Sequence, residues 1–290
     1  MSISSDERIL VAGPAWVGDM VMAQSLFISL KQARPGIEID VLAPEWSLPI
    51  LSRMPEVRKA ISLPVGHGQL ALVTRLKVGR ALRKEAYTRA IIIPRSYKAA
   101  LVPFFARIPR RTGYRGEMRY GVINDMRQLD KQLLTQTVQR YVELGIDNEV
   151  NKAPLVPQPC LIVDETNQQR LLEVHQLTLD RPVIGLIPGA EYGPAKQWPM
   201  KYYAALADRL LAKGYQVWIF GSARERELGQ CIVAGKQGII NLCGKTQLVD
   251  AVDLIALTDK IVTNDSGLMH VACATGRKVI AIYGLSLIHI

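Results

Sequence analysis

The chain has 290 residues, 49% hydrophobic and 21% charged, a balance that excludes a largely disordered protein. No apolar run approaches the roughly 18 residues that a membrane-spanning helix needs, and residues 1–8 lack the apolar core of a signal peptide. The net charge of +10 indicates an anionic partner: nucleic acid, a phosphorylated sugar, a nucleotide or a membrane surface. The four cysteines form no C-x-x-C pair and the histidines do not cluster, so we expect reduced thiols and no zinc site.

Short apolar strands alternate with helices through the first half of the chain. The pattern predicts strands at residues 8–12, 38–42, 58–63 and 90–93. It predicts helices at residues 20–33, 45–54, 70–84 and 98–106, the first ending before the helix-terminating sequence Arg34-Pro-Gly36.

The second half repeats this alternation. Strands are predicted at residues 183–187, 216–220, 238–242, 260–263 and 278–283, and helices at 165–176, 199–212, 225–234, 248–257 and 267–275. Two such runs predict two doubly wound α/β domains, 1–158 and 159–290, meeting in the proline-rich segment 148–159. In such sheets ligands bind at the carboxyl ends of the strands, which in two domains can face each other across a cleft.

The first polar segment is Gly13-Pro-Ala-Trp-Val-Gly-Asp19, between the first strand and the first helix. It matches neither a dinucleotide fingerprint nor a phosphate loop. A carboxylate here would repel a phosphate, so Asp19 suits proton transfer at the cleft. The alternative is a cap or first-turn residue stabilised by the helix dipole, and spacing alone favours that alternative.

Two further polar segments follow strands of the second half. In residues 188–196, two glycines allow close backbone approach to a ligand, and Lys196 can neutralise phosphate; a solvated loop is an equal alternative. In residues 263–270, Ser266 can cap a helix whose first amides point at an anion, and Asp265 can accept from a ribose hydroxyl. His270, four residues after Ser266, is by itself more typical of a structural histidine.

The fourth feature is a basic stretch at residues 77–119, with twelve Lys and Arg against two Glu. Arginine-rich loops containing Gly and Tyr suit phosphate recognition. A solvated charged face is the ordinary alternative, and nucleic acid is a rival ligand, although no nucleic-acid-binding motif is present.

Together these segments resemble the ADP-heptose:lipopolysaccharide heptosyltransferases, most closely the heptosyltransferase II branch. The resemblance rests on six segments in order, which extend over nearly the whole chain: GPAWVGDM (13–20), LSRMPE (51–56), LVPFF (101–105), RTGYRGEMRY (111–120), PGAEYGPAK (188–196) and TNDSGLMH (263–270). Each segment alone is weak, whereas all six in this order are specific.

The resemblance implies a GT-B fold, with two Rossmann-like domains facing across a cleft. It implies an inverting transferase that moves heptose from ADP-L-glycero-D-manno-heptose to the phosphorylated heptosyl-Kdo-lipid A inner core of lipopolysaccharide. The acceptor would bind the N-terminal domain and the nucleotide sugar the C-terminal one. Asp19 falls on the family's proposed base. Without an Asp-x-Asp motif, we expect no metal and no cofactor.

Site residues follow from the resemblance and the motifs together. Donor binding is assigned to Gly189, Lys196, Glu225, Asp265, Ser266, Gly267, Leu268 and His270. Acceptor binding is assigned to Gly18, Arg95, Ser96, Lys98, Arg115 and Arg119. The protein is expected to be cytoplasmic, with peripheral contact to the anionic inner membrane and no nucleic-acid partner.

The chain departs from the family pattern after Gly284, where the family continues with Pro and Ser/Thr. We interpret residues 285–290 as non-native and the second domain as incomplete; a short native strand is the alternative. Two rival functions remain: a related GT-B transferase with another nucleotide sugar or acceptor, such as heptosyltransferase I, and a non-enzymatic anion or nucleic-acid binder. The absence of G-x-G-x-x-G argues against a third, a nicotinamide oxidoreductase.

Overall fold

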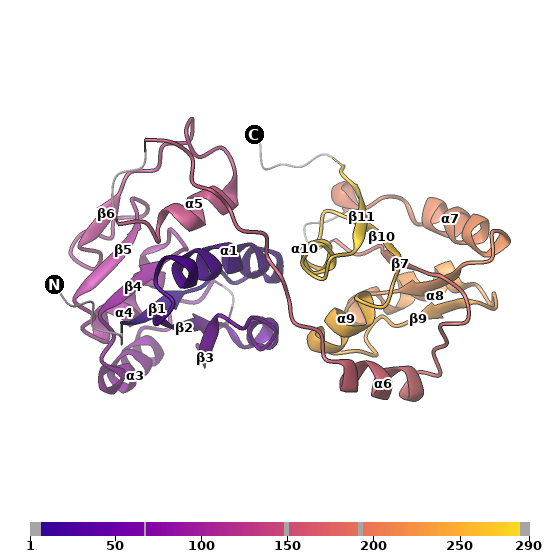
Figure 1. Cartoon of the computed structure of the whole chain (residues 1–290), viewed down its shortest axis with the longest axis horizontal. Coiled ribbons are helices and arrows are strands. Elements are labelled where there is room, and N and C mark those ends of the chain that lie inside the picture. Colours follow the sequence, from indigo (N-terminus) through magenta and orange to yellow (C-terminus); the bar gives the residue numbers. More distant parts are fainter. Residues whose placement is uncertain (1–6, 67, 148–150, 191–193, 285–290) are drawn as a thin grey trace. The chain divides into compact units, whose positions relative to one another are not determined.

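A computed structural model describes residues 7–66, 68–147, 151–190 and 194–284 (Figure 1). The chain divides into two compact units, residues 1–159 and 160–290. The division falls at the end of the proline-rich segment. The segment 285–290, interpreted above as non-native, lies outside the described residues.

The first unit is built on a six-stranded sheet in the order β3-β2-β1-β4-β5-β6, in which neighbouring strands are parallel. Its strands are β1 (Arg8–Ala12), β2 (Glu38–Ala43), β3 (Val57–Ser62), β4 (Arg89–Ile92), β5 (Arg110–Tyr114) and β6 (Asp125–Arg127). Its helices are α1 (Val17–Ala33), α2 (Leu48–Leu51), α3 (Leu72–Leu82), α4 (Leu101–Phe105) and α5 (Thr137–Glu143), with 3-10 turns η1 (Glu45–Ser47), η2 (Arg83–Glu85) and η3 (Tyr97–Ala100).

The alternation of side chains along β1 accounts for the two covered faces of this sheet. Leu10 and Ala12 belong to one core cluster with Leu82 of α3 and Leu101 of α4. The intervening Ile9 and Val11 point to the other face and are equally buried. A strand buried on both faces has few polar positions, which is why β1 reads as a continuous apolar run.

The second unit contains a five-stranded parallel sheet in the order β11-β10-β7-β8-β9. Its strands are β7 (Val183–Ile187), β8 (Gln216–Ile219), β9 (Ile239–Asn241), β10 (Lys260–Asn264) and β11 (Lys278–Ile282). Its helices are α6 (Glu165–Val174), α7 (Met200–Ala212), α8 (Arg226–Val233), α9 (Leu248–Ile255) and α10 (Gly267–Ala274), with 3-10 turns η4 (Pro194–Lys196) and η5 (Ala223–Glu225). Ile184 and Leu186 of β7 share a core with Tyr203 of α7 and Ile232 of α8.

Each sheet has a point where the strand order reverses, and crevices for ligands form there at the carboxyl ends of the strands. In the first sheet the reversal lies between β1 and β4, and in the second between β7 and β10. Asp19 follows β1 and Arg95 follows β4, whereas Gly189 follows β7 and Asp265 follows β10. Predicted site residues thus follow both strands at each reversal.

The prediction of two parallel-sheet α/β domains is confirmed. Among the described residues, the prediction missed two strands, β5 and β6, the helix α5 and the 3-10 turn η4. The interpretation of residues 107–119 as an arginine-rich loop is wrong in part, because Arg110–Tyr114 is a strand. The sequence Arg-Arg-Thr-Gly-Tyr contains no apolar run, so its strand character has no signal of the kind that identified β1.

Candidate active site

Asp19 lies in the first turn of α1, shortly after the carboxyl end of β1. The N-cap residue, Trp16, makes no side-chain capping hydrogen bond. The carboxylate of Asp19 in the first turn complements the positive end of the helix dipole. Asp19 is partly exposed and the neighbouring Gly18 is buried. The hydroxyl of Tyr141, on α5, donates to Asp19 Oδ1 at 3.3 Å. The position suits both a first-turn residue and a proton acceptor, and the catalytic role stays a prediction.

A cavity of about 320 Å³ lies at the carboxyl edge of the first sheet. It is formed by the loops that follow three adjacent strands, β4, β5 and β6. A Cβ on Gly116 would lie 2.3 Å from the carbonyl oxygen of Arg95, so the first two loops approach as closely as only glycine allows. Its lining includes three cations and no carboxylate: Arg95, Arg115, Gly116, Gln128, Leu129 and Lys131. This composition suits a phosphate group.

Arg119 fastens the loops beside this cavity. Its guanidinium donates to the carbonyl oxygens of Tyr114 and, at 2.7 Å, Pro94. The side chain is fully buried, and burial together with the nearby Arg95 lowers its pKa to about 10. In this structure Arg119 therefore holds the loop that carries Arg95 and Ser96, while direct contact with an acceptor stays a prediction. Lys98 lies in the 3-10 turn η3 that follows this loop, and it is partly exposed.

Lys196 and Asp265 meet at the carboxyl edge of the second sheet. Lys196 Nζ lies 2.6 Å from Asp265 Oδ2, and both side chains are largely buried. The neighbouring Asn264 joins the end of β10 to both ends of the segment between β7 and α7. Its Oδ1 accepts from the amide of Trp198 at 3.0 Å, and its Nδ2 donates to the carbonyl of Pro188 at 2.7 Å. Asp265 thus places the ammonium group beside the start of α10, where a diphosphate could contact both.

Ser266 occupies the N-cap position of α10, but its side chain does not cap the helix. This corrects the predicted capping role, because the hydroxyl instead lies 3.3 Å from that of Thr263. Gly267 and Leu268 begin α10, and the partly buried His270 follows in the same helix. First-turn amides have no partner within their own helix, so they can donate to an anion.

Glu225 lies beside Gly189, because a Cβ on that glycine would be 2.9 Å from Glu225 Cγ. Its carboxylate accepts from both the amide and the hydroxyl of Ser222, at 2.7 and 2.6 Å. The structure therefore brings Glu225 to the loop after β7, the place expected of a donor contact. Whether it binds a ribose stays a prediction.

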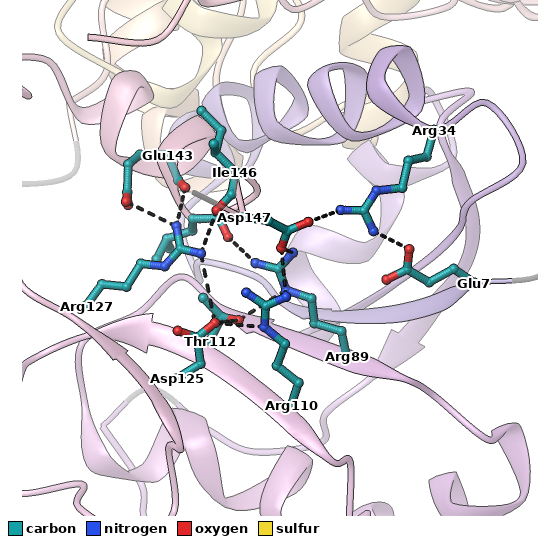
Figure 2. Close-up of polar contacts among 11 residues, drawn as sticks. Glu7, Arg34, Arg89, Arg110, Thr112, Asp125, Arg127, Glu143, Ile146 and Asp147 are labelled. Atoms are coloured by element: carbon teal, nitrogen blue, oxygen red, sulfur yellow. Dashed lines mark hydrogen bonds and ion pairs between the residues drawn. The ribbon is translucent and has the colours of Figure 1, made fainter. Parts of the chain in front are cut away.

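Several arginines of the basic stretch serve the fold. Figure 2 shows Asp147 accepting from Arg34, Arg89 and Arg110; its Oδ1 lies 3.0 Å from Arg89 Nη1 and 2.7 Å from Arg110 Nη1. Arg89 and Arg110 begin β4 and β5, so this network lies at the amino edge of the sheet, opposite the cavity. Burial, with repulsion from Arg110, lowers the pKa of Arg89 to about 10.

Sequence reasoning missed several residues of these sites, among them Tyr141, Lys131 and Asn264. Tyr141 is separated from Asp19 by 122 positions, and Lys131 lies outside the basic stretch. Only Asn264 had a usable signal, because a polar amide at the end of an apolar strand is buried and must then find a hydrogen-bond partner such as the backbone.

Comparison with known proteins decides the family. A model described as glycosyltransferase family 9 (heptosyltransferase) matches residues 75–287. The chain is 51% identical to lipopolysaccharide heptosyltransferase 2 of Salmonella typhimurium and 50% identical to that of Escherichia coli, in each case over 96% of this chain and 83% of the relative. The chain belongs to glycosyltransferase family 9.

Solved structures agree with this assignment. The structure of E. coli ADP-heptose lps heptosyltransferase II matches with a TM-score of 0.88 and 49% identity, covering 96% of this chain and 85% of that one. The predicted GT-B fold class is thereby confirmed. Within the described part of this family 9 chain, no helix is both long and apolar enough to cross a membrane.

Proposed function

We propose that this family 9 glycosyltransferase moves heptose from ADP-L-glycero-D-manno-heptose to the heptosyl-Kdo-lipid A inner core of lipopolysaccharide. The support that carries the proposal is the high identity to relatives named lipopolysaccharide heptosyltransferase 2. The site residues agree with it: each sheet reversal is followed by groups suited to one half of the reaction.

The donor is proposed to bind the second unit. Lys196 and the first amides of α10 would neutralise the diphosphate, which becomes the leaving group and gains negative charge in the transition state. The Lys196–Asp265 ion pair, at 2.6 Å, sets the position of the ammonium before a ligand arrives. A preorganised cation stabilises charge more effectively than one that must first be ordered.

The acceptor is proposed to bind the first unit. Asp19 would take the proton of the acceptor hydroxyl as that oxygen attacks the anomeric carbon, with inversion and no covalent intermediate. Acceptor phosphate would occupy the cavity lined by Arg95, Arg115 and Lys131. An anion there, beside the loop after β4, would orient the sugar relative to the loop after β1.

We propose a cytoplasmic location with peripheral contact to the inner membrane. The support is on α3 and the turn before it, where Leu70, Leu72 and Val73 expose half or more of their surface. Lys77 and Arg80 are exposed on the same helix. Exposed apolar and cationic side chains together favour a surface of anionic lipid.

The direct test is transfer from ADP-heptose to heptosyl-Kdo-lipid A, followed by mass spectrometry of the lipid product. Asp19→Ala should leave ADP affinity unchanged and reduce turnover by roughly 10²-fold or more, as expected for loss of a general base. Glu165→Ala is a matched control, because Glu165 is also an acidic residue in a helical first turn, on α6.

Retained turnover in Asp19→Ala would return Asp19 to a purely structural role. An absence of transfer by the unchanged protein, with ADP still bound, would favour another sugar or acceptor on the same fold. Salt-sensitive binding to arbitrary duplex DNA, without transfer, would favour the nucleic-acid alternative.

A further inference from the structure

The proposed base Asp19 has a tyrosine partner from a distant segment. The Tyr141 hydroxyl lies 3.3 Å from Asp19 Oδ1, and the helices that carry them, α1 and α5, pack against each other (Figure 1). Gly145, just after α5, permits close packing, because a Cβ there would lie 2.6 Å from Leu26 Cδ1 of α1. The tyrosine is therefore held against α1 by its helix rather than by a flexible loop.

The hydroxyl of Tyr141 can act only as a donor to the carboxylate. Burial is the largest cause that raises the pKa of Tyr141, and the charge of Asp19 and their hydrogen bond raise it further. A protonated phenol beside an ionised carboxylate must donate. Such a hydrogen bond stabilises the charged form of the acid and restricts its rotation.

We infer that Tyr141 is a positioning residue for transfer, whose hydroxyl fixes the orientation of the Asp19 carboxylate and keeps it ionised. The inference rests on the proposed function, because it takes Asp19 as the base. A base must be both ionised and aligned with the acceptor hydroxyl, and a hydrogen bond from a rigid helix contributes to both.

The charges that act on Tyr141 are those of Asp19 and Arg140. The Arg140 guanidinium is directed to backbone, since it donates to the carbonyls of Leu134 and Thr135 at 3.0 and 3.3 Å. The helix α2, which also packs on α1, carries no titratable side chain.

The test is Tyr141→Phe, which removes the hydroxyl and keeps the ring. We expect kcat to fall by roughly 10- to 100-fold, the cost of a misaligned catalytic group, with KM for ADP-heptose unchanged. The acidic limb of the pH–rate profile should move to higher pH, because the carboxylate loses a hydrogen bond that favours its charged form. In an Asp19→Ala background the same change should have no further effect.

The matched control is Tyr114→Phe. Its hydroxyl also contacts α5, lying 2.6 Å from Glu143 Oε2 and 2.8 Å from the carbonyl of Arg140, with no hydrogen bond to Asp19 among the described contacts. The control should lose stability without a change in the pH–rate profile. The inference would be overturned if Tyr141→Phe and Tyr114→Phe gave the same pH–rate profile. It would also be overturned if Tyr141→Phe reduced kcat as much in the Asp19→Ala background as in the unchanged protein.

One readout is independent of activity. The carboxyl carbon of Asp19 can be titrated by NMR in the unchanged protein and in both variants. We expect the midpoint to rise in Tyr141→Phe alone, and an unchanged midpoint would overturn the inference even if transfer is observed. Failure of the proposed function is recognised separately, as an absence of transfer by the unchanged protein, and failure of Asp19 as the base is recognised as retained turnover in Asp19→Ala.

Discussion

Asp147 offsets part of the positive charge of the first unit, because its carboxylate pairs with three arginines. Burial opposes its ionisation, but Arg89, Arg34 and Arg110 outweigh that effect and lower its pKa below the ordinary value of an aspartate. A carboxylate whose pKa is depressed by folding contributes stability at pH values above its unfolded pKa, and this stability is lost as pH falls through the folded pKa. We therefore expect the melting temperature to decline below about pH 4 in part through Asp147.

The measurement is the melting temperature between pH 2 and 6, for the unchanged protein and for Asp147→Asn. The variant should be less stable near neutral pH and should lose less stability on acidification. Glu173→Gln, at an exposed carboxylate on α6, is the control for removing one negative charge. Parallel pH curves for the unchanged protein and Asp147→Asn would show that the arginine network does not depend on this charge.

The sequence predicts residues whose signal is local and misses those whose partner is distant. Lys196 and Asp265 were identified because each follows a strand of a doubly wound pattern, and the topology then places the two strand ends side by side. Tyr141 carries no such signal, because its role depends on the packing of α5 against α1. Arg119 shows the opposite failure: its charge is visible in the sequence, but its burial is not.

The pairing of α3 with α4 depends on a glycine. A Cβ on Gly79 would lie 2.6 Å from Phe105 Cβ and 2.8 Å from the carbonyl oxygen of Val102. Alanine is intrinsically better in a helix by roughly 1 kcal/mol. Overpacking costs about 1–3 kcal/mol, so we expect Gly79→Ala to reduce the free energy of unfolding.

Urea denaturation measures this change directly. Ala81→Gly, at an exposed position of the same helix, is the control for intrinsic propensity and should cost about 1 kcal/mol. A stabilising Gly79→Ala would mean that α3 and α4 separate at little cost. Sequence patterns predict that α3 exists, but they do not predict this contact, because it depends on the distance between two helix axes.

The two units are expected to respond differently to nucleotide, because each has its own sheet and core. If the donor binds at the reversal of the second sheet, ADP should slow amide hydrogen exchange around residues 263–268 and at Lys196. The amino edge of the first sheet, including Arg89 and Arg110, should be unaffected. A ligand that binds only the folded state stabilises the part it contacts.

UDP at the same concentration is the matched control, since it carries the same diphosphate with a different base. Stronger protection by ADP would support an adenine-specific donor site and hence ADP-heptose as the sugar donor. Equal protection by both nucleotides would mean that the site reads only the diphosphate, through Lys196 and the α10 amides. Protection confined to residues 1–159 would contradict the assignment of the donor to the second unit.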